Sequence, residues 1–521
     1  MNTLIHKFSN VINGNISGFD RIVFKGSILP LMHEQGAAGF CSRRGILNKD
    51  FKEWMLARTT GIVADAESFS MTNREERIMP INSFKLRKES LAHEHQRRNN
   101  IDSGLIGIWS AVESCVTFKA RFDKVAGYPR LSRHWGKCKH LYFYYDHNDY
   151  GFMNIRLQTW FPYHIQVAMN GREWLRRTLE KLGIGHSVKR NKFTSIDNFQ
   201  EAQRILNEQR NSLWTEILSG FLPDVFPSME SVIGKELSYY WTIWQSELAT
   251  DLIFDSPRQI DPFINTLLRY AFMTGSMTNV MRYMDRPLTA KGKPRANCAD
   301  EFKGRCISFN DGLCLRFWLS GNSVKIYNEA NVLRVETTLN KPSAFKAYRH
   351  KLGDSDNSPK KLRPLRKSVA DTALAAAKSE QVNDRFMNQL AQCTDETAAS
   401  EIFGKVSSTM KKNGKRIRAL DLTGKDCALI QAISTPKFNV TGMRNAMLRD
   451  LLKAEKGYAG KSEKQLSSKI SRQLRLLRDH GLIRKVASQN RYYLSPKGQQ
   501  LTAVLNATLA ASTQELMKMA A

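Results

Sequence analysis

The chain has 521 residues, of which 42% are hydrophobic and 10% aromatic, so it holds enough apolar material for several folded domains and is not a disordered chain. Its formal net charge is +30 at pH 7 and its pI is about 9.8, an excess that favours a polyanionic partner, most commonly DNA or RNA. No apolar run reaches the roughly 18 residues of a membrane span and no signal-like segment opens the chain, so we expect a cytoplasmic protein without a membrane partner.

Residues 1–195 predict an N-terminal α+β domain with an antiparallel sheet. One short strand is expected over Arg21–Ile28, directly after the turn-forming run Ser17-Gly18-Phe19-Asp20. Asp20 then stands at a strand edge, where it has two interpretations. It is either the first carboxylate of a metal-dependent nuclease or an ordinary turn residue after Gly18.

Short β-branched or aromatic runs joined by Gly, Pro and Asp turns predict five strands between residues 105 and 169. Alternation turns one side of these strands toward a core. The opposite side would carry Asn154, Arg156, Gln158, Trp160 and Gln166. Such a face is typical of a platform that stacks single-stranded bases, and equally of a sheet covered by a helix.

Two further carboxylates, Asp146 and Asp149, follow a predicted strand and are candidate metal ligands or plain loop residues. Eight cysteines are scattered without a CxxC pair, which predicts reduced thiols and argues against a zinc ribbon. Cys138 and His140 lie close in sequence, but two ligands do not make a metal site, so none is assigned here.

Residues 196–290 predict a central helical region, with helices over Asp197–Leu218, Met229–Phe254 and Asp261–Met284. Aromatic residues recur in it at core-like spacing. No motif in this region indicates chemistry.

Residues 291–350 predict a basic β-hairpin region that opens with Lys291–Arg295 and has strands at Cys314–Leu319, Ser323–Tyr327 and Val332–Leu339. The last two strands resemble a hairpin of plasmid and phage rolling-circle replication initiators, in which a Tyr-Asp-Lys turn precedes an Arg-x-Glu strand. Here Asn328-Glu329 stands in place of Asp-Lys. The resemblance implies nicking chemistry at Tyr327 and Glu336, whereas the residues alone also fit a simple cross-strand ion pair of Glu336.

Residues 351–418 predict a basic linker that contains one helix, over Ser368–Leu390. The stretch Lys341–Lys367 has nine basic residues against Asp354 and Asp356, and Lys405–Arg418 has six basic residues and no acid. Such runs are usually solvated, but next to a nucleic-acid module they add salt-dependent affinity.

Residues 419–521 predict three helices followed by a hairpin, which is the order of a winged helix. The helices are expected over Thr423–Ile433, Thr441–Ala454 and Ser462–His480, and the hairpin over Leu482–Val486 and Tyr492–Leu494. In the third helix one buried stripe is formed by Leu466, Ile470, Leu474 and Leu477, and Gly481 ends the helix.

The third helix and the hairpin are strongly basic, with nine Lys or Arg against two acids between Lys461 and Arg491. A helix of this kind lies in the major groove while the hairpin touches the backbone. The residues expected to contact nucleic acid are Lys464, Ser468, Ser471, Arg472, Arg475, Arg484, Lys485 and Arg491. The alternative is a winged helix that only packs against the rest of the chain or a partner protein.

Two resemblances accompany this reading. The segments Leu477–Ile483 and Leu494–Gly498, before and after the hairpin, resemble winged-helix regulators of the MarR type. Most of the chain also resembles a group of uncharacterised bacterial proteins, which share Gly18–Gly26, Leu157–Pro162, Asn170–Trp174 and the Arg334–Asn340 strand. The second resemblance implies one full-length unit and brings no activity.

Together these features predict a cytoplasmic, multidomain α+β protein that binds nucleic acid, with DNA preferred to RNA, through a C-terminal winged helix, as proteins of mobile elements do. The first alternative is a nicking or strand-transfer enzyme, similar to a replication initiator or transposase, with Asp20, Asp146, Asp149 and Glu336 as candidate Mg²⁺ ligands and Tyr327 as a further catalytic candidate. The second is a transcriptional regulator with a large sensing domain. Oligomer formation is compatible with each of them.

Overall fold

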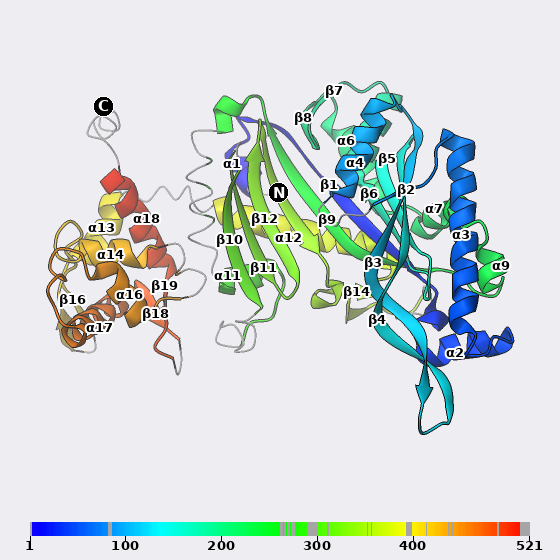
Figure 1. The fold of residues 1–521 in the computed structure, drawn as a ribbon. Coiled ribbons are helices and arrows are strands. Elements are labelled where there is room, and N and C mark those ends of the chain that lie inside the picture. The colour runs from blue at the N-terminus through cyan, green and yellow to red at the C-terminus, as the bar shows by residue number, and fades with distance from the viewer. Residues whose placement is uncertain are drawn as a thin grey trace. The chain divides into compact units, whose positions relative to one another are not determined.

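The computed structural model describes residues 3–81, 86–260, 264, 267, 271, 277–289, 301–309, 312–351, 353–355, 357–391, 399–412, 414–435, 438, 442–486 and 489–510. Helices and strands are mixed along the chain, consistent with the predicted α+β class (Figure 1). The chain divides into two compact units. The sheet unit comprises Asn13–Asp255 and Glu336–Gln381, and the terminal unit comprises Met1–Ile12, Ser256–Val335 and Val382–Ala521.

The sheet unit is built on seven strands in the hydrogen-bonding order β9-β1-β6-β5-β4-β3-β2. Their bounds are β1 (Ile12–Ser27), β2 (Met79–Pro80), β3 (Gly104–Asp123), β4 (Tyr128–His147), β5 (Gly151–Gln158), β6 (Ile165–Asn170) and β9 (Tyr240–Phe254). Neighbours from β1 to β3 pair antiparallel, whereas β2 pairs parallel with β3. Beyond β9 in this order comes β13 (Val332–Leu339), whose residues Glu336–Leu339 belong to this unit.

The register of this sheet separates a buried face from a polar face. Lys25, Gln166 and Arg156 are direct partners on β1, β6 and β5, and Tyr142 continues the row on β4. The adjacent row is apolar and fully buried, and consists of Phe24, Val167, Ile155 and Phe143. The predicted polar side of Asn154, Arg156, Gln158 and Gln166 is therefore confirmed for the two strands that carry it. Trp160 lies beyond β5, where its Nε1 donates to Phe118 O at 3.0 Å.

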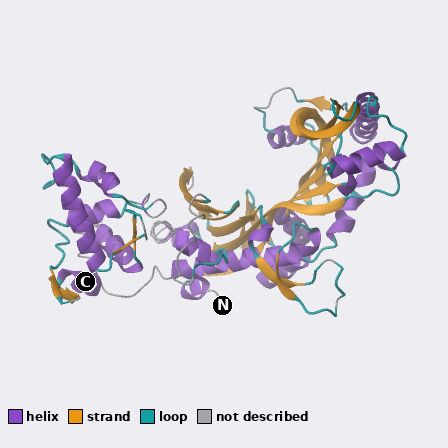
Figure 2. Ribbon diagram, turned by 90° about the horizontal axis from the view of Figure 1, so that it is seen from below, coloured by secondary structure: helices purple, strands orange, loops and turns teal. Residues whose placement is uncertain are grey.

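Helices and two small hairpins complete the sheet unit (Figure 2). The longest helix, α3, packs on β3, and its Phe69 lies against the buried-face Phe143. The helices are α2 (Glu34–Arg43), α3 (Phe51–Arg74), α4 (Lys88–Arg98), α5 (Gly171–Lys181), α6 (Phe199–Arg210), α7 (Trp214–Gly220), α8 (Leu222–Val225) and α9 (Met229–Ile233). The hairpins are β7 (His186–Lys189) with β8 (Lys192–Ile196), and β14 (Lys346–Arg349) with β15 (Lys361–Pro364), the latter within the basic stretch Lys341–Lys367.

The prediction of a continuous central helix over Met229–Phe254 is wrong. Only Met229–Ile233 is helical, and Gly234 follows it with a φ of 94°, a conformation that glycine adopts without strain. From Tyr240 the chain forms the 15-residue strand β9. Its first five residues, Tyr240–Trp244, are all aromatic or β-branched. Their side chains alternate between buried and more exposed positions, and both properties favour a strand.

The terminal unit begins with α1 (Thr3–Lys7) and α11 (Met277–Tyr283). Its strands β10 (Phe302–Phe309), β11 (Gly312–Leu319) and β12 (Asn322–Glu329) pair in sequence, and the first half of β13 follows after a two-residue turn. Helix α12 (Thr372–Leu390) enters this unit at Val382. Much of the predicted helix Asp261–Met284 and all of the basic segment Lys291–Arg295 lie outside the described residues.

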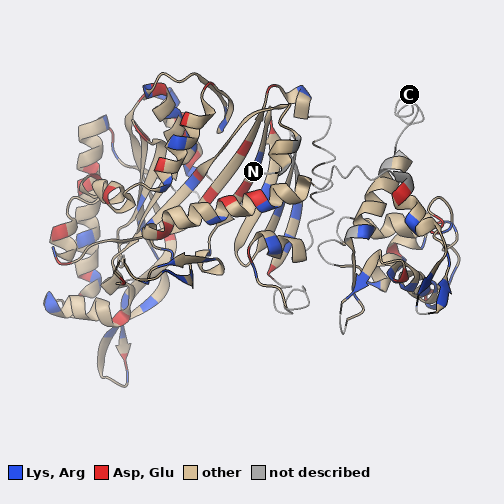
Figure 3. Cartoon of the chain, turned by 180° about the vertical axis from the view of Figure 1, so that it is seen from behind, with Lys and Arg blue, Asp and Glu red and all other residues tan. Residues whose placement is uncertain are grey.

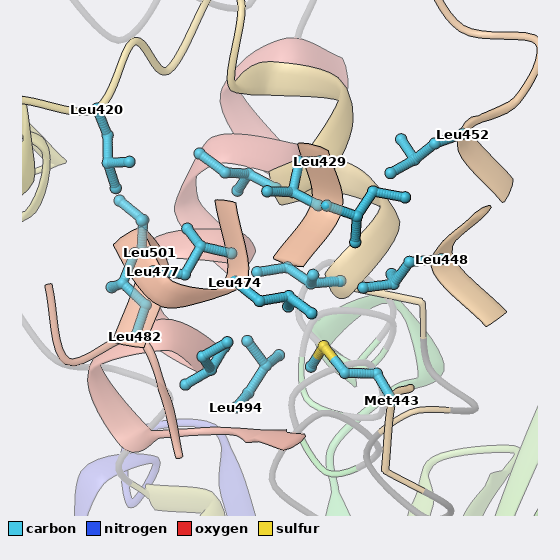
Figure 4. Close-up of a cluster of buried hydrophobic side chains, with 14 of the residues drawn as sticks. Leu420, Leu429, Met443, Leu448, Leu452, Leu474, Leu477, Leu482, Leu494 and Leu501 are labelled. Carbon is cyan, nitrogen blue, oxygen red and sulfur yellow. The ribbon is translucent and has the colours of Figure 1, made fainter. Parts of the chain in front are cut away.

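The C-terminal part of the terminal unit is mostly helical. It contains α13 (Ala399–Ser407), β16 (Met410–Lys412), β17 (Lys415–Ile417), α14 (Cys427–Ile433), α16 (Asn445–Leu452), α17 (Glu463–Asp479), β18 (Ile483–Lys485), β19 (Tyr492–Leu494) and α18 (Pro496–Ala510). Leucines from α14, α16, α17, the hairpin and α18 point toward one another in a single core (Figure 4). Among the helices that the structure describes, none has the length and apolar character needed to cross a membrane.

Candidate nucleic-acid interface and carboxylate cluster

Helix α17 is fixed at its start and along one side. Ser462 forms a capping box, because its Oγ accepts from the Gln465 backbone N–H at 3.4 Å while the Gln465 side chain accepts from the Ser462 N–H at 3.0 Å. The predicted stripe of Leu466, Ile470, Leu474 and Leu477 is buried in the core. The opposite side of the helix is consequently held toward solvent.

A hollow of about 830 Å³ lies over the N-terminal half of α17 and is called the basic hollow below. It is lined by Arg418, Lys425, Asp426, Lys461, Lys464, Gln465, Ser468, Lys469, Arg472 and Gln473. Its acid, Asp426, is already neutralised by Arg418, whose Nη atoms lie 2.6 and 2.8 Å from the carboxylate. Figure 3 shows Lys and Arg gathered on this helix. The surface is therefore suited to the phosphates of a nucleic acid.

The structure sorts the predicted contact residues into two groups. Seven of the eight are exposed, and Arg491 is half-buried. The first group consists of Lys464, Ser468, Arg472, Arg475 and Lys485. Three are engaged within the unit: Ser471 accepts from Asn445 Nδ2 at 2.9 Å, Arg484 donates to Thr278 Oγ1 at 3.1 Å, and Arg491 is half-buried against Gly442. Lys425 was not among the predicted contacts, and Arg418 was included only as the end of the basic stretch Lys405–Arg418. The fold brings both residues to α17.

Three carboxylates meet on neighbouring strands of the sheet unit and are called the carboxylate cluster. Asp20 on β1, Glu247 on β9 and Glu336 on β13 each bring one oxygen to within 4.8 Å of the others. Glu336 is fully buried, whereas Asp20 and Glu247 are half-buried and line a cavity of about 230 Å³. Carboxylate oxygens gathered this closely repel one another and are the ligands that Mg²⁺ and Mn²⁺ prefer.

The position of Asp20 is set by a chain of side-chain amides. Asn191 Nδ2 donates to Asp20 Oδ1 at 2.6 Å, and Asn170 Nδ2 donates to Asn191 Oδ1 at 2.9 Å. Asn170 also caps α5, because its side chain accepts from the Arg172 N–H. Helix α5 starts against β1, since a Cβ on Gly171 would lie 2.3 Å from Phe19 O. The cap and this close approach hold the amide chain beside Asp20.

The other predicted catalytic residues have different surroundings. Asp146 accepts from Arg177 Nη2 at 2.5 Å and from Gln96 Nε2 at 2.8 Å. Asp149 pairs with Lys181, and hydrogen bonding from Lys181 lowers the pKa of its carboxyl group. Both aspartates thus join the β4–β5 turn to α5. Tyr327 lies on β12 in the terminal unit, with Lys325 Nζ 5.2 Å from its ring centre.

A second donor group consists of Cys115, Cys138 and His140, all buried in the sheet unit. The two sulfurs lie 3.1 Å apart, and the pKa of Cys115 is lowered chiefly by its hydrogen bond with Cys138. Burial lowers the pKa of His140 to about 4, so its imidazole is neutral at pH 7 and able to ligate. Two thiols and an imidazole are soft donors suited to zinc. Only Cys138 and His140 were recognisable as neighbours in the sequence.

No known family model, curated protein or solved structure matches the chain. Its function is therefore inferred from the residues and the geometry described above.

Proposed function

We propose that the chain binds DNA through its C-terminal part, arranged as a winged helix similar to those of MarR-type regulators. The order α14, α16, α17, then the β18–β19 hairpin agrees with that arrangement. The observation that carries the proposal is the basic hollow on α17, which is lined by residues of the helix outside its buried leucine stripe. RNA is the alternative polyanion for the same surface.

In this proposal α17 enters the major groove. Arg472 and Arg475 are exposed on it and reach base edges, where an arginine makes bidentate contacts with guanine. Lys485 on β18 contacts phosphate and contributes to all sequences equally. Whether the chain then acts as a regulator or as part of a mobile element depends on whether it leaves the DNA intact.

The proposal is tested with the Arg472→Ala and Arg475→Ala variants of the full chain. Each substitution should weaken binding to a selected duplex by about 1–3 kcal/mol if the side chain reads a base. Binding is measured by fluorescence anisotropy on DNA recovered by selection from a random pool. The matched control is Arg97→Ala/Arg98→Ala, which removes the same charge from exposed positions on α4. An unchanged isotherm for the Arg472/Arg475 double variant would rule out α17 as the contact.

A second candidate function is metal-dependent cleavage of a phosphodiester, favoured by the convergence of Asp20, Glu247 and Glu336. These carboxylates would hold one divalent cation, and Asn191 would orient Asp20 as a ligand. Such a cation supplies Lewis-acid activation of the phosphate and of an attacking water.

Cation binding at this cluster has a readout that does not depend on activity. Mn²⁺ should raise the melting temperature of the parent, and Glu336→Gln, which removes a charge at nearly constant shape, should abolish that rise together with any Mg²⁺-dependent cleavage. Glu94→Gln, on the exposed side of α4, is the control. A rise that persists in Glu336→Gln would show that Glu336 is a structural group only.

A further inference from the structure

We infer that the polar face of the sheet unit carries a second nucleic-acid site, a cavity that holds the phosphates and bases of a single strand. The cavity, called the basic cavity below, has a volume of about 220 Å³. Lys25, Arg156 and Gln166 from the polar row of the sheet line it, and Arg133 from β4 adds a third cation. None of the described residues that line it is acidic.

The cations around the basic cavity exceed the acids near them. Arg156 pairs with Glu113 at 3.0 Å, but Glu113 is shared with Lys88 at 2.7 Å. Among the described residues no carboxylate pairs with the Lys25 amine or the Arg133 guanidinium, although the Arg133 backbone N–H donates to Glu34 Oε1 at 2.7 Å. The amines of Lys25 and Lys367 both lie 5.0 Å from the centre of the Trp244 ring. Burial, followed by the charges of Arg156, Lys367 and Arg133, lowers the pKa of Lys25 to about 8.

The close approach of these cations destabilises the folded chain, and a bound anion would remove that destabilisation. Positive groups held together in a partly buried cavity repel one another, and a phosphate placed among them converts the repulsion into attraction. A surface whose only task was structural would gain by replacing Lys25 with an apolar side chain. The arrangement is therefore better explained by an anionic ligand than by packing.

Two tryptophans in the basic cavity indicate that its ligand is a nucleic acid rather than a simple anion. Trp135 and Trp244 line the same cavity and are 71% and 47% exposed, respectively. Large aromatic rings exposed to this degree beside unpaired cations are the combination by which proteins stack successive bases and track their phosphates. Gln166 lines the same cavity, and its amide can bond a base edge. Gln158 is buried, and its Nε2 donates to the backbone carbonyls of Val116, Trp160 and Phe161.

The basic cavity also adjoins the carboxylate cluster along the sheet. On β5, Asn154 lines the carboxylate cavity and Arg156 lines the basic cavity. On β6, Ala168 lines the carboxylate cavity and Gln166 lines the basic cavity. Two residues of a strand span about 7 Å, so the two cavities lie next to each other along the sheet. A strand bound in the basic cavity would thus pass the carboxylates.

This site shares only the class of ligand with the DNA contact proposed for α17, and it lies in the other unit. Its test uses the full chain carrying Arg472→Ala/Arg475→Ala, so that duplex binding and strand binding are scored separately. Three ligands are compared: a labelled twelve-nucleotide thymidine strand, thymidine monophosphate and inorganic phosphate. Quenching of tryptophan fluorescence reports the unlabelled ligands, and anisotropy reports the strand.

In that background the thymidine strand should still bind, and Lys25→Met or Trp244→Leu should each weaken it at least about tenfold. The matched control is Lys52→Met. Lys52 is an exposed lysine on α3, and that helix covers the buried face of the sheet, away from the basic cavity. Melting temperatures confirm that each variant is folded, and Lys25→Met should melt no lower than its parent. Strand binding unchanged by both substitutions overturns the site. Equal affinity for the monophosphate and the strand overturns the assignment to a polynucleotide.

Discussion

Lys25 on β1 lines the basic cavity, and its titration also makes the stability of the folded chain depend on pH. Its pKa falls from 10.5 to about 8 on folding, because burial and neighbouring cations disfavour the charged amine. Between these pH values the unfolded chain holds more protons than the folded chain, so this residue makes stability rise with pH. Below pH 8 the amine of Lys25 is charged in the folded state, and this charge lowers the free energy of unfolding.

We therefore expect Lys25→Met to raise the free energy of unfolding at pH 7. The advantage of the variant over the parent should shrink as the pH rises from about 8 toward 10.5, because the parent's amine is then neutral. Urea unfolding at pH 7 and pH 9.5 measures this difference, with Lys52→Met as the control. A variant less stable than the parent at pH 7 would show that Lys25 is a favourable packing or pairing group.

The buried pair of Arg172 and Asp251 behaves differently, because the two opposite charges pair with each other. Arg172 Nη2 lies 3.0 Å from Asp251 Oδ2 and also donates to Ala249 O at 2.9 Å, so α5 is tied to β9. Removing one partner leaves a buried charge, so Arg172→Met should cost about 3–5 kcal/mol. Arg172→Met/Asp251→Leu should recover much of the loss. Equal losses in the single and double variants, by urea unfolding, would mean that packing dominates.

At the scale of single elements, α17 offers a direct test of how its start is fixed. Ser462→Ala removes one half of the capping box and should cost about 0.5–2 kcal/mol. The loss should appear as faster hydrogen exchange in the first turn, near Gln465, while exchange near Leu477 changes less. Ser468→Ala, an exposed serine inside the same helix, is the control. Equal effects of the two substitutions would show that the Ser462 cap does not stabilise the first turn of α17.

The success of the sequence-based prediction varied with the element. The stripe Leu466–Leu477 recurs at helical spacing and is followed by the helix-ending Gly481, so α17 was placed to within one residue at each end. Tyr240–Phe254 carries aromatic residues whose spacing fits a buried helix as well as a strand, and the strand was missed.

That one error concealed two residues of the proposed sites. With Tyr240–Phe254 taken as helix, Glu247 had no strand neighbours and Trp244 was assigned to a core. Asp20 and Glu336 were singled out separately, but their meeting depends on β9 lying between β1 and β13, a long-range pairing that no local pattern encodes. Lys25 was overlooked for the same reason, since its cationic neighbours come from β4, β5 and residue 367.

For the whole molecule, the two proposed nucleic-acid sites predict a preference for DNA that has both a duplex and a single-stranded part. A duplex with a single-stranded extension should bind more tightly than either part alone, because the second contact becomes intramolecular. Binding should weaken with salt by a slope of about −0.9 per duplex phosphate contact and −0.7 per single-strand contact. Titrations of duplex, strand and junction at several salt concentrations measure both quantities.

The variants separate the two contributions to junction binding. Arg472→Ala/Arg475→Ala should reduce junction affinity to that of the strand, and Lys25→Met should reduce it to that of the duplex. A junction that binds no better than the stronger of its parts would show that the two sites do not act on one molecule of DNA.

The division of the chain into interleaved segments has a consequence for its synthesis. The sheet unit is completed by Glu336–Gln381, which leaves the ribosome long after β9. Until β13 emerges, β9 has β1 on one side and an open edge on the other, with backbone N–H and C=O groups available to any neighbouring strand. The nascent chain is therefore most exposed to mispairing between the translation of residues 254 and 336. A product terminated at Val335 would keep that edge permanently and would also lack Glu336.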